Sequence, residues 1–252
     1  MKVLKFVSLV MCFVIFTGIV CSADNSYNWY IKKNGNNTPG FPENSDFVSA
    51  HNGFYIDKNA AENGEKIIYL TFDAGYENGN IEKILDIMKE ENVTGAFFIL
   101  TNLIKKHPDL VKRMAEDGHL VCNHTSNHKD MTKLTKEEML CNLERLELQY
   151  KECTGLDMEK IFRFPEGKYN EECILTCEEA GYKTVFWSMA YDDWDNARQP
   201  SKEIAKRKLL DTTHSGAIVL LHPTSRTNAD ILCDLIKEWK NQGYTFGNLS
   251  DL

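Results

Sequence analysis

The sequence predicts an α/β protein built on a parallel sheet or barrel, and three observations support this. From residue 66 onward, short apolar runs typical of strands alternate with longer helix-like stretches. No repeat, low-complexity tract or linker divides residues 66–252. A chain of 252 residues fits one such domain better than two. Its net charge of −8 argues against a nucleic-acid binder, which would carry a basic surface.

Six apolar runs are the predicted strands, and six stretches between and after them are the predicted helices. We expect strands at 66–72, 94–100, 119–122, 159–163, 182–188 and 216–221. We expect helices at 81–90, 108–116, 135–153, 171–180, 201–210 and 228–241. Thr135 and Glu138 form a capping box at the start of one helix, and Gly155 follows its end. This order predicts βαβ units, whose strands run parallel.

The first 65 residues differ from the rest of the chain. Residues 1–23 are predicted to be a signal peptide, because Lys2 and Lys5 precede about 15 mostly apolar residues and a small-residue site ending at Ala23. We therefore expect an exported, extracytoplasmic protein that meets the membrane only if this segment stays uncleaved. Residues 24–65 are rich in Asn, Gly, Pro and Ser, which predicts an irregular N-terminal arm that packs by its aromatic side chains.

Six of the eight cysteines lie outside the predicted signal segment: Cys122, Cys141, Cys153, Cys173, Cys177 and Cys233. Most fall within apolar or helical patterns, and no Cys-x-x-Cys pair occurs. This favours small buried thiols over a disulfide framework or a zinc knot. A bridge between Cys141 and Cys153 stays open.

Charged or imidazole side chains follow five of the six predicted strands. In strand order they are Asp73, the pair His124 and His128, Arg163, Asp193 and His222. Parallel strands bring their carboxyl ends to one edge, so we expect these side chains to lie close together. Each has an ordinary structural interpretation when taken alone. Asp73 precedes Gly75 and is compatible with simple turn chemistry.

Together these groups suggest hydrolysis by water. A helical turn would place the two histidines on one face, where they reach one divalent ion, most commonly zinc. Such an ion lowers the pKa of a bound water to about 7, and Asp73 can take the proton. His222 can protonate the leaving group with Asp193 orienting its ring, and Arg163 can keep Asp73 ionised. No Gly-x-Ser-x-Gly motif occurs, so we prefer attack by water over a covalent mechanism.

These segments resemble the polysaccharide deacetylase (NodB-homology) family, carbohydrate esterase family 4, over about residues 65–250. The family's motifs correspond to Thr71-Phe72-Asp73-Ala74-Gly75, His124 to His128, Arg163-Phe164-Pro165-Glu166-Gly167, Asp193-Trp194 and Leu220-Leu221-His222. The resemblance implies a distorted (β/α) barrel. It also implies metal-assisted removal of acetyl from an N-acetylated sugar.

The resemblance also implies a role for each matched residue. Asp73 would be the base and His222 the acid. Arg163 would adjust the pKa of Asp73, and Asp193 would adjust the pKa of His222. The metal ligands would be His124 and His128. Contacts to the substrate or the oxyanion would come from Gly75, Tyr76, Pro165, Glu166 and Trp194.

Further segments resemble the peptidoglycan N-acetylmuramic acid deacetylases that form the δ-lactam of the spore cortex. They are residues 76–79, 187–194 and 221–229. This implies that acetyl is removed from muramic acid whose peptide is gone, after which the amine closes onto the lactyl carboxyl. The implied partners are a peptidoglycan glycan strand and an N-acetylmuramoyl-L-alanine amidase that first strips the peptide.

One residue departs from the pattern of most of the family. Ala74 stands where most members have a second aspartate that binds the metal, although the δ-lactam subgroup also lacks it. Two protein ligands remain against the usual three at a catalytic zinc, so we expect weak metal binding. Two alternatives stay open: a non-catalytic glycan-binding module, and a deacetylase or O-acetyl esterase acting on chitooligosaccharide or xylan. The retained acid/base residues argue against the first, because binding alone does not need them.

Overall fold

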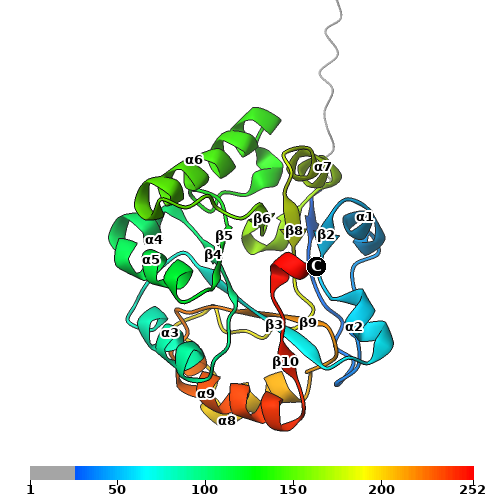
Figure 1. Cartoon of the computed structure of the whole chain (residues 1–252). Helices are drawn as coiled ribbons and strands as arrows, with labels where there is room; N and C mark the ends of the chain where they lie inside the picture. The colour runs from blue at the N-terminus through cyan, green and yellow to red at the C-terminus, as the bar shows by residue number, and fades with distance from the viewer. Residues whose placement is uncertain (1–25) are drawn as a thin grey trace, which may run out of the picture.

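The computed structural model describes residues 26–252, and the predicted signal peptide lies outside this range. Its frame is a curled, mostly parallel sheet in the order β10-β3-β4-β5-β6-β8-β2, with β9 on the other side of β3 (Figure 1). Six strands occupy the predicted positions: β3 (Ile67–Ala74), β4 (Ala96–Ile99), β5 (Leu120–Asn123), β6 (Ile161–Phe162), β8 (Lys183–Val185) and β9 (Ala217–Leu221). The expected distorted (β/α) barrel is confirmed.

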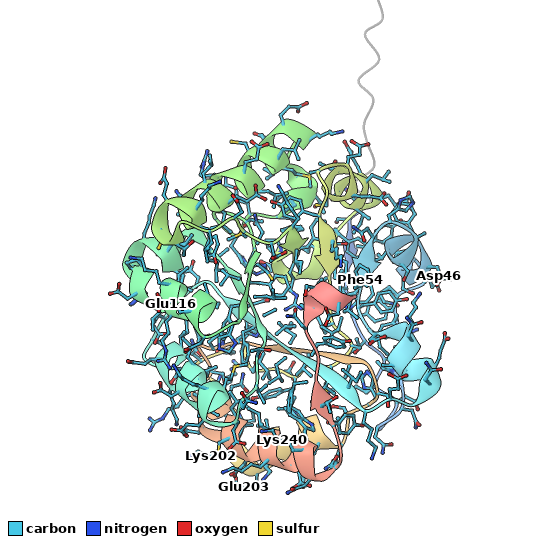
Figure 2. The ribbon with its side chains drawn as sticks, viewed as in Figure 1. Asp46, Phe54, Glu116, Lys202, Glu203 and Lys240 are labelled. Atoms are coloured by element: carbon cyan, nitrogen blue, oxygen red, sulfur yellow. The ribbon has the colours of Figure 1, made fainter. Side chains whose placement is uncertain are left out.

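The predicted helices are also present and surround the strands (Figure 1). They are α3 (Ile81–Glu90), α5 (Pro108–Glu116), α6 (Lys136–Thr154), α7 (Glu171–Glu179), α8 (Lys202–Leu210) and α9 (Arg226–Asn241). Each buries one stripe against the sheet, as α3 does with Ile81, Ile84, Leu85 and Met88. Charged residues such as Glu116, Lys202 and Glu203 project outward from this ring (Figure 2). None of the helices within 26–252 is long and apolar enough to cross a membrane.

Several short elements have no counterpart in the sequence prediction. The strands are β1 (Tyr27–Asn28), β2 (Gly53–Phe54), β7 (Lys168–Tyr169) and β10 (Thr245–Phe246). The helices are α1 (Ser45–Ala50), α2 (Lys58–Asn63) and α4 (Thr101–Lys106), with single 3₁₀ turns η1 (Met131–Lys133), η2 (Pro165–Gly167) and η3 (Leu249–Asp251). The strands among them are only two residues long, so they lack the periodic signal that identifies an element.

Alternation along β3 decides which side chains face the barrel interior. Ile68, Leu70, Phe72 and Ala74 pack in the cluster between the sheet and the helices. The intervening residues point the other way, because side chains alternate along a strand, and Tyr69 packs in the interior cluster with Phe98, Ile218 and Leu249. Since Leu249 belongs to η3, this turn covers the end of the barrel near the start of β3 (Figure 1). Asp73 lies on the inward register, at the opposite end.

The two ends of the curled sheet meet through isolated bridges only. Met189 bridges Val219 in parallel, and Ile56 bridges Ala217 in antiparallel orientation. The Leu220 N–H donates to the carbonyl of Met189 over 2.8 Å. This sparse closure is what distorts the barrel. It leaves the segment after β8 free to carry Tyr191 to Trp194 to the open end.

The N-terminal segment packs onto the barrel by its aromatic residues. Trp29 stacks on Phe186 at 4.4 Å and lies 4.9 Å from Tyr55 between ring centroids. β1 pairs antiparallel with β7, and β2 pairs with β8 at the edge of the main sheet. The boundaries predicted for the signal peptide, arm and barrel stay predictions. All six cysteines of the described chain are free thiols, and Cys122, Cys173 and Cys177 are buried.

Candidate active site

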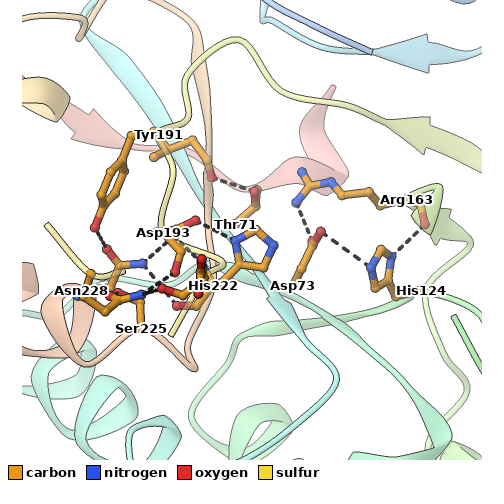
Figure 3. Close-up of polar contacts among 12 residues, drawn as sticks. Thr71, Asp73, His124, Arg163, Tyr191, Asp193, His222, Ser225 and Asn228 are labelled. Atoms are coloured by element: carbon orange, nitrogen blue, oxygen red, sulfur yellow. Dashed lines mark hydrogen bonds and ion pairs between the residues drawn. The ribbon is translucent and has the colours of Figure 1, made fainter. Parts of the chain in front are cut away.

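Asp73 and Arg163 form a buried ion pair at the mouth of the barrel. Arg163 follows β6 and is fully buried, and its Nη1 donates to Oδ1 of Asp73 over 2.9 Å (Figure 3). Its other two guanidinium nitrogens also donate, Nε to the carbonyl of Val185 at 3.0 Å and Nη2 to that of Phe186 at 3.2 Å. A buried cation that is paired and fully hydrogen-bonded is tolerated, whereas an unpaired one is not.

The charges around Asp73 keep its carboxylate ionised. Burial alone would raise the pKa of Asp73, but its electrostatic interactions with His124, Arg163 and His222 outweigh burial and lower it. At neutral pH Asp73 therefore has no proton and can accept one.

His124 and His128 lie in a loop after β5, so the predicted helical turn is wrong. Thr125 and His128 adopt left-handed backbone angles, with φ of 74° and 58°. Such a conformation is strained for a β-branched residue. The Oδ1 of Asn123 accepts from the Thr125 N–H at 2.8 Å, and Thr125 Oγ1 accepts from the His128 N–H at 2.8 Å. This loop still brings the two imidazoles together, with ring centroids 5.0 Å apart.

The histidine pair fits a divalent ion as two of its ligands. The carbonyl of Arg163 lies 2.8 Å from Nδ1 of His124, so Nδ1 carries the hydrogen and Nε2 keeps its lone pair. That Nε2 faces Oδ2 of Asp73 at 3.6 Å. Burial lowers the pKa of His124 to about 4, which keeps the ring neutral, as a metal ligand must be. Within residues 26–252, no group of three or more His, Cys, Asp or Glu side chains is arranged to hold a metal.

Asp193 and His222 form a second acid–imidazole pair (Figure 3). Nδ1 of His222 donates to Oδ1 of Asp193 at 2.7 Å, and the backbone N–H of His222 donates to Oδ2 at 2.7 Å. Burial alone would lower the pKa of His222, but the hydrogen bond and charge of Asp193 outweigh it and raise the pKa. Asp193 therefore favours the protonated ring, whose Nε2 is available to donate.

Asn228 and Tyr191 support this pair, and sequence reasoning gave them no role. Nδ2 of Asn228 donates to Oδ2 of Asp193 at 2.6 Å, and Oδ1 of Asn228 accepts from the Tyr191 hydroxyl. Ser225 caps α9 and thereby places Asn228 in the first turn of that helix. The Ser225-x-x-Asn228 spacing was the available signal, although a capping pattern does not reveal a partner outside its helix.

A cleft of about 850 Å³ joins these groups. Eight of the predicted site residues line it: Asp73, Gly75, Tyr76, His124, His128, Glu166, Trp194 and His222. The other three, Arg163, Pro165 and Asp193, are buried in contact with that lining. Tyr76 and Trp194 are 59% and 65% exposed, which suits stacking on a sugar and shows that Trp194 is not core packing. Sequence reasoning missed further lining residues, including Ile31 and Lys33 of the N-terminal arm.

The turn η2 contributes Glu166 and Gly167 to the lining of this cleft. Glu166 and Gly167 have φ of 56° and 65°. The Gly167 N–H donates to the carbonyl of Phe164 at 3.0 Å, and Pro165 has no N–H. The amide of Glu166 is therefore the turn's candidate oxyanion donor. Trp29, the residue after β1, braces the turn, since its N–H donates to the carbonyl of Gly167 at 2.8 Å.

The sequence model of the polysaccharide deacetylase family matches residues 60–185. This chain belongs to the polysaccharide deacetylase family. It is 39% identical over 228 residues to peptidoglycan-N-acetylmuramic acid deacetylase PdaA of Bacillus subtilis, covering 89% of this chain and 85% of that protein. The solved structure of PdaA, a family 4 carbohydrate esterase, matches with a TM-score of 0.85 at 36% identity, covering 92% of this chain and 98% of that one.

Two Bacillus anthracis structures that match this chain are a family 4 esterase and a family 4 pseudoenzyme. A family 4 carbohydrate esterase matches with a TM-score of 0.75 at 34% identity, covering 91% of this chain and 97% of its own. A family 4 pseudoenzyme matches with a TM-score of 0.68 at 26% identity, covering 74% of this chain and 65% of its own. Polysaccharide deacetylases are hydrolases acting on C–N bonds and are generally metal-dependent, which identifies the class of this chain.

Proposed function

We propose that this chain removes the N-acetyl group of muramic acid in peptidoglycan strands whose peptide has been cleaved off. The freed amine then closes onto the lactyl carboxyl to give the muramic δ-lactam of spore cortex. The observation that carries the proposal is that a carboxylate and an imidazole line one cleft, each held by a buried charged partner. Asp73 is paired with Arg163, and His222 is paired with Asp193. Similarity to PdaA over nine-tenths of the chain supports muramic acid as the sugar.

The geometry supports a direct attack of water on the acetamide. Asp73 takes the proton of the water as the water oxygen bonds to the carbonyl carbon. The Glu166 N–H donates to the oxygen that becomes negative. His222 then gives its Nε2 proton to the sugar nitrogen, the C–N bond breaks, and acetate leaves. His124 and His128 would hold a divalent ion, with zinc the first candidate, which when bound polarises the acetyl carbonyl and acidifies water.

The proposed product explains the proposed partner and location. Lactam formation needs a free lactyl carboxyl, so an N-acetylmuramoyl-L-alanine amidase has to act first. The glycan strand lies outside the membrane, in accord with the signal peptide predicted at residues 1–23.

The deciding experiment uses peptide-free glycan strands, divalent metal and the full exported chain. Mass spectrometry should show loss of acetyl from muramic acid, followed by loss of water on lactam closure. Asp73→Asn serves as the inactive control. If wild type yields neither free amine nor lactam but still binds the strands, the chain is a glycan-binding module. Acetate release from acetylated xylan or chitooligosaccharide, but not from these strands, would assign another polysaccharide.

A further inference from the structure

Residues 32–40 form a small hairpin at the edge of the cleft. The Lys32 N–H donates to the carbonyl of Gly40 at 2.7 Å, and the Gly40 N–H donates back at 2.9 Å. The chain on either side is anchored, because the rings of Trp29 and Phe41 lie 4.9 and 4.4 Å from the ring of Tyr55. The hairpin is therefore fixed to the barrel at both ends.

This hairpin places a cation on the cleft wall. Lys33 is exposed and lines the cleft, and it is the only Lys or Arg side chain among the lining residues of the described chain. No carboxylate of residues 26–252 lies within 4.0 Å of its ammonium group. Of the three carboxylates that line the cleft, Asp73 is paired with Arg163 and Glu166 with Lys168 at 2.6 Å, whereas Asp192 has no ion pair among the described residues. Lys33 therefore has no carboxylate partner among the described residues, and its ammonium group is free to meet an anionic group of a ligand.

Muramic acid carries a negative charge that can pair with the ammonium group of Lys33. Its lactyl ether stands on the ring carbon next to the acetamido carbon, so a carboxylate accompanies the reacting nitrogen into the cleft. N-acetylglucosamine has no such group, and in peptide-bearing muramic acid the lactyl carboxyl is a neutral amide. A lysine suits this task because its flexible stem and compact charge adapt to a carboxylate on a rotatable side arm.

We propose that Lys33 binds the free lactyl carboxylate and so selects peptide-free muramic acid over both alternatives. This rests on the proposed function and adds a specificity-determining residue to it. The N-terminal hairpin then contributes substrate choice, while the barrel contributes the chemistry.

The test compares Lys33→Gln with Lys32→Gln, the adjacent lysine, which is not among the cleft-lining residues and lies 5.7 Å from the ring of Tyr30. Acetate release is measured on peptide-free muramic acid strands, peptide-bearing strands and chitooligosaccharide. Lys33→Gln should lower kcat/KM about tenfold on the first substrate alone, chiefly by raising KM. Lys32→Gln should behave as wild type and Lys33→Arg should keep the preference. Added salt should weaken the preference of wild type but not that of Lys33→Gln.

Two results would overturn the inference in different ways. Suppose that wild type acts on muramic acid, and that Lys33→Gln keeps the same substrate preference or lowers kcat/KM equally on all substrates. Lys33 then does not bind the lactyl carboxylate, and the proposed function stands. If wild type is inactive on every muramic acid substrate, the proposed function fails first.

Discussion

Arg163 holds Asp73 with its side chain and His124 with its main chain. Its Nη1 lies 2.9 Å from Oδ1 of Asp73, and its carbonyl oxygen lies 2.8 Å from Nδ1 of His124. The proposed base and a proposed metal ligand are thus oriented by one fully buried residue.

We expect Arg163→Met to lower both stability and turnover. Removing one partner of a buried pair leaves the other charge uncompensated, which costs about 3–5 kcal/mol in the free energy of unfolding. The pKa of Asp73 should also rise, because burial then acts with less opposition. Urea denaturation and acetate release measure the two effects. Asp73→Asn is the matched control, since its amide oxygen still accepts from Arg163: turnover should vanish with a smaller loss of stability. An Arg163→Met protein as stable as wild type would contradict the pairing.

The alkaline side of the pH–rate profile should report His222. The groups facing it are Asp193 and Asp73, which raise its pKa, and Arg163, which lowers it, and the net shift is upward. A general acid works while protonated, so activity should persist through neutral pH and fall as pH rises through this raised pKa. Asp193→Asn removes the main raising charge and should move that fall to lower pH. A profile of kcat/KM against pH with an unmoved alkaline side would refute the assignment.

Zinc binding should be measurable but weak. His124 and His128 are the two proposed imidazole ligands, and Ala74 contributes an apolar, fully buried side chain. Calorimetry should show binding that His124→Ala and His128→Ala each abolish, and chelation should remove wild-type activity. Tight binding that survives both substitutions would place the metal elsewhere.

Gly167→Ala should impair catalysis as well as stability. Gly167 has φ of +65°, and an added Cβ would lie 2.7 Å from Cη2 of Trp187 and 3.1 Å from Cβ of Trp29. The turn would have to shift and carry the Glu166 N–H with it, so we expect kcat to fall. Gly155→Ala is the control, because its φ is +78° but nothing lies within 4 Å of the new Cβ. It should cost about 1–2 kcal/mol of stability and leave kcat unchanged. Equal kcat values for the two variants would remove η2 from the proposed oxyanion site.

The barrel and the main site residues were predictable because their signals are local. Long apolar runs identify β3 and β9, and parallel strands bring their carboxyl ends together, which explains why Asp73, Arg163 and His222 were found. The histidine loop was predicted wrongly as a helical turn because its shape depends on Asn123 and on strain at Thr125, which no periodicity encodes.

The contribution of the N-terminal arm was not predictable from sequence. Ile31 and Lys33 lie at the cleft because Trp29 and Phe41 pack on Tyr55 and because β1 pairs with β7, more than 130 residues away in the chain. Two-residue strands leave no pattern of their own. Asn228 was missed for a similar reason, since its partner Asp193 lies on a different segment.

The pairing of β1 with β7 also limits how far the chain can be shortened from its N-terminus without changing the cleft. The segment that matches the family model, residues 60–185, lacks Trp29, which braces η2, the hairpin, β9, and Asp193 and His222. A proteolytic fragment or expression clone cut to that segment would therefore lose the proposed acid and one wall of the cleft. Cleavage at the predicted signal site near residue 23 would spare β1, whereas an exoprotease that advances past Tyr27 would remove the pairing of β1 with β7 without touching the barrel.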